Sequence, residues 1–178
     1  MQVSVSRRAL FKGRLNQPAY PAVRPPWSVE EQSFQDICTR CDDCVKACEE
    51  GVITRGDGGY PEIDFKLGEC TFCADCAGAC RPGAIAPAHA DHVSGQVSPW
   101  GLIARIGGDC LSAGGVTCRV CGDRCDAEAI QFELLVGGRA NPIIDLAACT
   151  GCGACVAPCP TGTVNVVHVS QGSQETYS

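Results

Sequence analysis

The chain has 178 residues, 16 of them cysteines and only 6% aromatic, which suffices for one ordinary domain but leaves little material for a large conventional core. It contains no run of 18 apolar residues, so we expect no membrane span. The formal charge is −6, and it is unevenly distributed: residues 1–29 have five basic and no acidic side chains, whereas the rest of the chain has nine basic and twenty acidic ones. Because the acidic part repels phosphate groups, we expect no nucleic-acid partner.

Residues 1–29 are expected to form a basic, proline-rich arm, because four prolines between positions 18 and 26 disfavour helix and sheet. Residues 6–12 (SRRALFK) resemble a twin-arginine export motif, but residues 13–18 (GRLNQP) follow where an apolar stretch should stand. We therefore do not expect this segment to export the chain. Two interpretations of the arm stay open: a solvated basic tail, or a docking arm that uses Arg7 and Arg8 to bind a partner.

Four runs of cysteines follow the arm and use all 16 of them. Three runs have two, two and three residues between successive cysteines, which is the spacing of iron–sulfur ligands in bacterial ferredoxins, and the last of them is closed by Pro160. The third run in chain order is stretched, because seven residues separate its first two cysteines. The runs are Cys38, Cys41, Cys44 and Cys48; Cys70, Cys73, Cys76 and Cys80; Cys110, Cys118, Cys121 and Cys125; and Cys149, Cys152, Cys155 and Cys159.

Short secondary-structure elements are predicted around these runs. Residues 28–31 (SVEE) have the pattern of a capping box and predict a short helix that runs towards Cys38. Turn sequences at residues 57–59 (DGG) and 136–138 (VGG) predict two hairpins, and residues 100–106 have the apolar content of a strand. A β-branched residue recurs five positions after each closing cysteine, where it can begin a strand and shield a cluster from water; these residues are Ile53, Ile85, Ile130 and Val164.

Together these patterns predict an α+β, loop-rich fold of two bacterial-ferredoxin-like modules, with short β-hairpins and short helices around pairs of clusters. The first module is expected to span residues 30–88 and the second residues 89–169. Residues 170–178 are polar, and we expect a disordered tail there.

The pairing of runs predicts which cysteines share a cluster, because in two-cluster ferredoxins the fourth cysteine of a run ligates the other cluster. We expect [4Fe-4S] clusters at the three regular runs and a fourth at the stretched run, whose first ligand has to arrive from a wider loop. The expected ligand sets are Cys38, Cys41, Cys44 and Cys80 (site 1); Cys48, Cys70, Cys73 and Cys76 (site 2); Cys110, Cys118, Cys121 and Cys159 (site 3); and Cys125, Cys149, Cys152 and Cys155 (site 4).

Other roles for the cysteines fit the spacing less well. Disulfide frameworks are typical of secreted proteins with an export signal, and structural zinc sites usually divide two cysteine pairs across a longer loop. For the third run, a zinc site or a labile cluster stays open. His89 and His92 are expected to be solvated, and His168 to lie on a strand.

The sequence contains no nucleophile and base constellation, phosphate loop or nicotinamide fingerprint. We therefore expect a protein without a substrate site of its own, and not an enzyme. Glu49, Arg81 and Asp126 stand where proline commonly follows the fourth cysteine of a ferredoxin run. These departures bear on reduction potentials more than on ligation.

The ordered set of motifs is more specific than any single run. Four runs, the third of them stretched, follow residues 6–8 (SRR) and 24–27 (RPPW). With these features, and with its stretches at 38–42, 55–61 and 149–155, the chain resembles the NapF family, the ferredoxin-type accessory proteins of periplasmic nitrate reductase systems.

The resemblance implies a cytoplasmic protein that contacts the immature catalytic subunit of periplasmic nitrate reductase and assists its maturation before export, through electron transfer or assembly of its iron–sulfur site. The alternative is a multi-cluster ferredoxin-type electron carrier between a quinol or dehydrogenase pathway and a reductase. The first function needs a complex with the immature subunit, whereas the second needs only brief encounters with other redox proteins. The basic arm favours the first.

Overall fold

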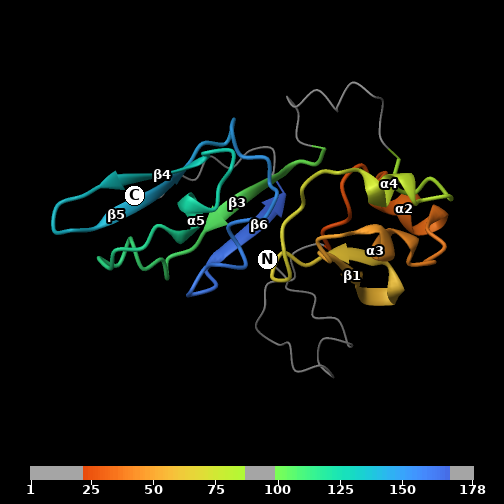
Figure 1. Cartoon of the computed structure of the whole chain (residues 1–178), viewed down its shortest axis with the longest axis horizontal. Helices are drawn as coiled ribbons and strands as arrows, with labels where there is room; N and C mark the ends of the chain where they lie inside the picture. The colour runs from red at the N-terminus through yellow and green to blue at the C-terminus, as the bar shows by residue number, and fades with distance from the viewer. Residues whose placement is uncertain (1–21, 87–98, 169–178) are drawn as a thin grey trace, which may run out of the picture.

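The computed structural model describes residues 22–86 and 99–168. Figure 1 shows two groups of short elements along the long axis of the molecule, with α2, α3, α4 and β1 in one group and β3 to β6 with α5 in the other. No helix in these two ranges is long and apolar enough to cross a membrane. Our predictions for Arg7 and Arg8, for His89 and His92, and for the tail at 170–178 concern residues outside the described ranges.

Up to residue 86, where the described part of the first module ends, the chain forms one hairpin and three short helices. Strand β1 (Ile53–Arg55) pairs antiparallel with β2 (Pro61–Ile63), which places Ile53 opposite Ile63. Between them the turn at Asp57–Gly59 forms a short 3-10 segment, η1, in which two glycines take left-handed conformations with φ of 71° and 80°, as a tight reversal requires. The hairpin predicted here is confirmed. The helices are α2 (Glu31–Ile37), α3 (Asp43–Ala47) and α4 (Asp75–Gly78).

Between residues 99 and 168, the second module contains two strand pairs and one short helix, α5 (Val120–Asp123). Strand β4 (Ile130–Leu134) pairs antiparallel with β5 (Ala140–Ile144), which confirms the hairpin predicted at residues 136–138. Strand β3 (Leu102–Ile106), predicted from its apolar content, pairs with β6 (Val164–His168) along its whole length. His168 is exposed at the end of β6, where it faces Leu102 across the pair.

The two modules pair their ends in the same way. In the second module, β3 precedes the cysteine runs and pairs with β6, which follows them. In the first module, Ser28 forms an antiparallel bridge with Ile85, and the N–H of Val29 donates to the carbonyl of Ala84 at 3.0 Å. The internal repeat therefore extends from the cysteine spacing to the strand pairing, and a loop-rich α+β fold of two ferredoxin-type modules is confirmed.

The start of helix α2 differs from the prediction. The helix is present, but its N-cap residue is Glu30 and makes no side-chain capping bond. Ser28, predicted to cap the helix, instead donates its hydroxyl to the carbonyl of Pro25 at 2.7 Å. The capping-box prediction is wrong because the backbone of Ser28 is held in the bridge to Ile85, before the helix begins.

Residues 22–29, which we predicted as the end of the arm, pack against the first module. Pro25 and Pro26 are fully buried, and the N–H of Ile63 donates to the carbonyl of Val23 at 2.8 Å. The Arg24 guanidinium donates to the Glu31 carboxylate at 2.7 Å and 2.8 Å. The packed unit therefore begins before residue 30, since the prolines that prevent helix formation do not prevent an extended segment from packing.

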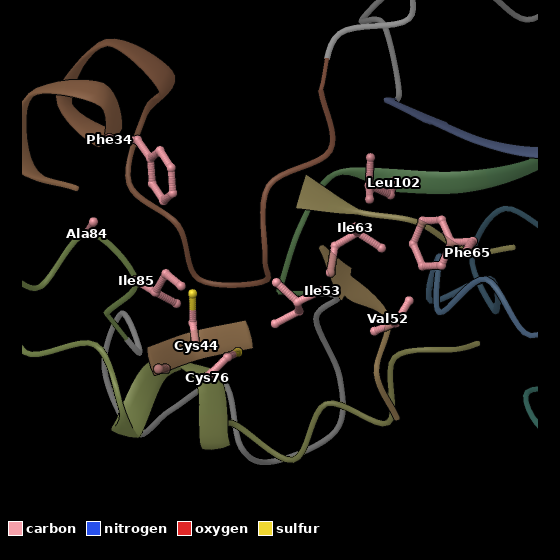
Figure 2. Close-up of a cluster of buried hydrophobic side chains, with 11 residues drawn as sticks. Phe34, Cys44, Val52, Ile53, Ile63, Phe65, Cys76, Ala84, Ile85 and Leu102 are labelled. Atoms are coloured by element: carbon pink, nitrogen blue, oxygen red, sulfur yellow. The ribbon is translucent and has the colours of Figure 1, made fainter. Parts of the chain in front are cut away.

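Two hydrophobic clusters form the interior, and each includes cysteines. The β-branched residues that follow the closing cysteines are all buried, with exposed fractions between 2% and 7%, as predicted for shields of the cluster sites. Figure 2 shows the first cluster, into which Cys44 from α3 and Cys76 from α4 project. Leu102 from β3 also belongs to this cluster, so the second module contributes to the core of the first.

Candidate iron–sulfur sites

The loops of the three regular runs share one backbone conformation around their second cysteine. The residues before and after that cysteine have left-handed φ values of 58° and 63° in the first run, 56° and 67° in the second, and 72° and 83° in the fourth. Left-handed residues in such loops turn successive N–H groups to one side, which creates the anion-binding concavities found at many iron–sulfur sites. The six residues are Arg40 and Asp42, Phe72 and Ala74, and Gly151 and Gly153.

The third cysteine of each run is buried, whereas all other cysteines are half-buried or exposed. Burial is the main cause that raises the pKa of Cys44 and Cys121 to about 11 and that of Cys76 and Cys155 to about 12, and nearby thiols add to it. Metals bind the thiolate form of cysteine, so metal binding at these positions has to release the thiol protons. The positive charge of the metal then stabilises thiolates that burial would otherwise disfavour.

Three cavities are each lined by four cysteines. Every one combines three cysteines of one run with the closing cysteine of the neighbouring run in the same module. The cavities contain Cys38, Cys41, Cys44 and Cys80; Cys48, Cys70, Cys73 and Cys76; and Cys110, Cys118, Cys121 and Cys159. Elements from two runs therefore converge at sites 1, 2 and 3, although the crossed ligation itself stays a prediction.

The chemistry and placement of these donors fit an iron–sulfur cluster. Four thiols surround one space at each of the three sites, and buried aliphatic side chains, among them Ile53, Ile85 and Val164, line the walls. Within the described ranges, no group of His, Cys, Asp or Glu has the geometry of a single-ion site. Thiols spread around a cavity are the arrangement that a group of four irons and four sulfides requires.

Three of the four cysteines expected at site 4 belong to the second hydrophobic cluster or pack against it. Cys155 belongs to the second hydrophobic cluster, and Cys125 and Cys149 pack against it. The N–H of Ala104 on β3 donates to the Cys149 sulfur at 3.4 Å. Cys152 lies at the edge of the module, where its carbonyl accepts the N–H of Cys70 at 2.8 Å.

The stretched third run forms a compact loop. The N–H of Gly114 donates to the carbonyl of Cys110 at 3.0 Å, and the N–H of Val116 donates to that of Leu111 at 2.9 Å. Ser112 is only 3% exposed, and its carbonyl accepts the N–H of Ala140 on β5 at 3.2 Å. The additional residues therefore fold onto β5 and return the chain to the cavity that Cys110 and Cys118 line together.

Hydrogen bonds to cysteine sulfur were not predicted from the sequence, and they matter because they tune the potential of a cluster. The N–H of Ile85 donates to the Cys80 sulfur at 3.3 Å. The Thr161 hydroxyl lies 3.6 Å from the Cys159 sulfur. Burial tends to raise the pKa of Cys159, but the bonds from Thr161 and from nearby backbone N–H groups outweigh it and lower the pKa overall. A threonine two positions after the closing cysteine is a signal that only the fourth run carries.

Two family matches agree with the cysteine sites. Residues 37–85 match the 4Fe-4S dicluster domain, and residues 142–165 match the 4Fe-4S binding domain. With the cavities described above, these matches define a ferredoxin-type iron–sulfur protein that binds multiple [4Fe-4S] clusters.

Curated relatives identify the family within this class. The chain is 40% identical to the ferredoxin-type protein NapF of Escherichia coli K12, over 95% of this chain and 98% of that protein. It is 43% identical to NapF of Haemophilus influenzae, over 85% and 82% of the two chains. The chain belongs to the NapF family of ferredoxin-type proteins. It is also 33% identical to the methylamine utilization ferredoxin-type protein MauM of Paracoccus denitrificans, over 79% and 68%. No solved structure matches the chain.

Proposed function

We propose that this protein acts in the cytoplasm as an iron–sulfur accessory protein that binds the immature catalytic subunit of periplasmic nitrate reductase and assists its maturation before export. Membership of the NapF family over nearly the whole chain carries the proposal. The proposed role is the one that the resemblance of the motifs implies for this family. The assistance consists of electron transfer to the partner or of help in assembling its iron–sulfur site.

The exposure of particular cysteines supports exchange of electrons with a partner. Bound [4Fe-4S] clusters supply one-electron transfer. Cys41 and Cys73, the second cysteines of the first two runs, are exposed, while Cys44 and Cys76 behind them are buried. One edge of sites 1 and 2 is therefore accessible at the surface, whereas the opposite edge is shielded from water by Ile85 and Ile53.

The rim of site 1 carries charges of both signs. Arg40 and Asp42 flank Cys41, and Asp42 accepts a hydrogen bond from the Arg55 guanidinium at 2.7 Å. Arg40 lies over the Tyr60 ring with 5.1 Å between the guanidinium carbon and the ring centroid. A small polar surface around an accessible cluster edge is typical of transient redox complexes.

A second candidate function is that of a plain electron carrier between a quinol or dehydrogenase pathway and a reductase. One observation favours it: relatives with the name of another system, methylamine utilization, share 30% to 33% identity with this chain. The shared framework is therefore compatible with electron transfer in more than one system.

A binding experiment separates the two functions. The full chain, purified without oxygen and with its clusters, is used to capture either the precursor or the mature form of the nitrate reductase catalytic subunit. The maturation function predicts selective capture of the precursor. Equal capture of both forms, or of neither, would contradict it and leave the electron carrier as the better description.

A further inference from the structure

The two modules meet at a junction built from aromatic rings and from the loops of the second and fourth runs. In Figure 1 the yellow segment that follows β2 lies between the two groups of elements. Trp100 packs edge to face against Phe65 and Phe72, with ring centroids 5.9 Å and 5.5 Å apart. The indole N–H of Trp100 donates to the carbonyl of Thr150 at 3.0 Å. We call this region, with Cys70 and residues 150–153, the module junction.

Glycines of the fourth run allow the close approach at this junction. A Cβ on Gly153 would lie 1.9 Å from the Phe65 ring, and one on Gly151 would lie 2.5 Å from the carbonyl oxygen of Leu102. The left-handed conformation alone does not require glycine here, because Asp42 and Ala74 adopt it at the position equivalent to Gly153. What distinguishes the fourth run is that another part of the chain lies against its loop.

The junction joins ligands of two different sites. The N–H of Cys70, expected at site 2, donates to the carbonyl of Cys152, expected at site 4, at 2.8 Å. Cys152 is the second cysteine of its run, and it is half-buried, whereas the equivalent Cys41 and Cys73 are exposed. At sites 1 and 2 the second cysteine of the run faces solvent, whereas at site 4 the equivalent Cys152 faces the first module.

Within each module the two sites are also adjacent. Cys44 of site 1 and Cys76 of site 2 share the first hydrophobic cluster, as Figure 2 shows. Cys121 of site 3 and Cys155 of site 4 share the second cluster. Contacts therefore follow one another in the order site 1, site 2, site 4, site 3.

We propose that the module junction connects the two cluster pairs into a single electron-transfer chain of four sites, and that Phe65 and Gly153 are positioning residues that hold site 2 against site 4. This inference rests on the cluster-binding part of the proposed function and not on the identity of the partner. Each transfer moves one electron, so that the centre on one side of the junction is oxidised as the centre on the other is reduced, without breaking a bond or moving a proton. In the experiment below, dithionite supplies the first electron.

Gly153→Ala tests the junction without removing a ligand. Its matched control is Gly137→Ala in the turn between β4 and β5, because Gly137 has a φ of 86°, close to the 83° of Gly153, and nothing within 4 Å of a Cβ. Both variants carry the same backbone strain, whereas only Gly153→Ala forces Phe65 away. The full chains are prepared without oxygen, analysed for iron, and reduced with dithionite for electron paramagnetic resonance.

We expect equal iron content in the three proteins and the same spin-coupled spectrum in the wild type and Gly137→Ala. Gly153→Ala should lose the part of the coupling that crosses the junction. If Gly153→Ala retains full iron and the wild-type spectrum, the proposal is overturned. If Gly153→Ala loses iron, the Trp100→Ala variant is used for the test instead. Reduced coupling at full iron content would then support the junction, and unchanged coupling would refute it. A wild-type chain without iron would instead contradict the cluster-binding function itself.

Discussion

Truncating Ile85 to alanine should open site 1 to water and to chelators. Ile85 is 2% exposed and lines the cavity of Cys38, Cys41, Cys44 and Cys80. Removing a buried isoleucine side chain down to alanine costs about 2–5 kcal/mol. Because about 1.4 kcal/mol corresponds to a tenfold change in an equilibrium constant, the open state of the first module should become at least about 25-fold more populated. The N–H of residue 85 can still bond the Cys80 sulfur.

The assay is the rate of iron release to a chelator, followed without oxygen by the loss of visible absorbance. When opening and closing are fast relative to capture, this rate tracks the population of the open state. The matched control is Ile143→Ala, because Ile143 on β5 is 49% exposed and its truncation should cost only about 1 kcal/mol or less. If Ile85→Ala released iron no faster than Ile143→Ala, the shielding role of the residue five positions after the closing cysteine would be refuted.

Three further predictions concern the ligands, the packed segment and the arm. Cys48→Ser should damage the cluster held by Cys70, Cys73 and Cys76 more than that of its own run, because ligation crosses between runs; spectroscopic loss confined to site 1 would reject the crossing. Arg24→Ala should lower the unfolding free energy by about 1 kcal/mol at neutral pH, as it removes the ion pair with Glu31 and the ring contact with Phe34. The hydrogen bond from Arg24 lowers the pKa of Glu31. The pair therefore contributes its full stability above the ordinary glutamate pKa of about 4.3, and this contribution is lost as the pH falls through the lowered pKa. The denaturant midpoints of the wild type and Arg24→Ala should therefore converge in acid. Arg7→Ala with Arg8→Ala, or deletion of residues 1–21, should leave the iron content unchanged but weaken binding to the immature catalytic subunit and reduce the salt dependence of that binding. Unchanged affinity and an unchanged salt slope would instead favour the interpretation of these residues as a solvated tail. The deletion ends at residue 21 because Pro25 and Pro26 are buried in the first module.

The local features of the fold could be predicted because they depend on spacing along the chain. A cysteine run fixes a tight loop, and the residue five positions beyond it is carried into the core. For this reason Ile53, Ile130 and Val164 begin strands, and Ile85 forms its bridge, as predicted. The turn glycines at 58 and 59 marked the first hairpin for the same local reason.

Features that depend on distant parts of the chain were missed. Ser28 has the local pattern of a cap, but its bridge to Ile85 takes its backbone out of the capping position. The packing of Trp100 against Phe65 and Phe72 has no periodic signal in the sequence. One signal was present: glycine stands on both sides of the second cysteine only in the fourth run. The structure explains it by the close approach of Phe65 from the first module to Gly153 and of Leu102 on β3 to Gly151.

The central claim, that four crossed cysteine sites hold [4Fe-4S] clusters, is tested most directly by iron, sulfide and zinc analysis of the full chain prepared without oxygen. The account predicts about four iron atoms and four sulfides for each of four sites, the stretched run included. It also predicts that removing the iron with a chelator abolishes cooperative melting, since metal binding supplies much of the folding free energy. Stoichiometric zinc in place of iron, or a cluster-free chain that keeps its secondary structure and melts cooperatively, would contradict it.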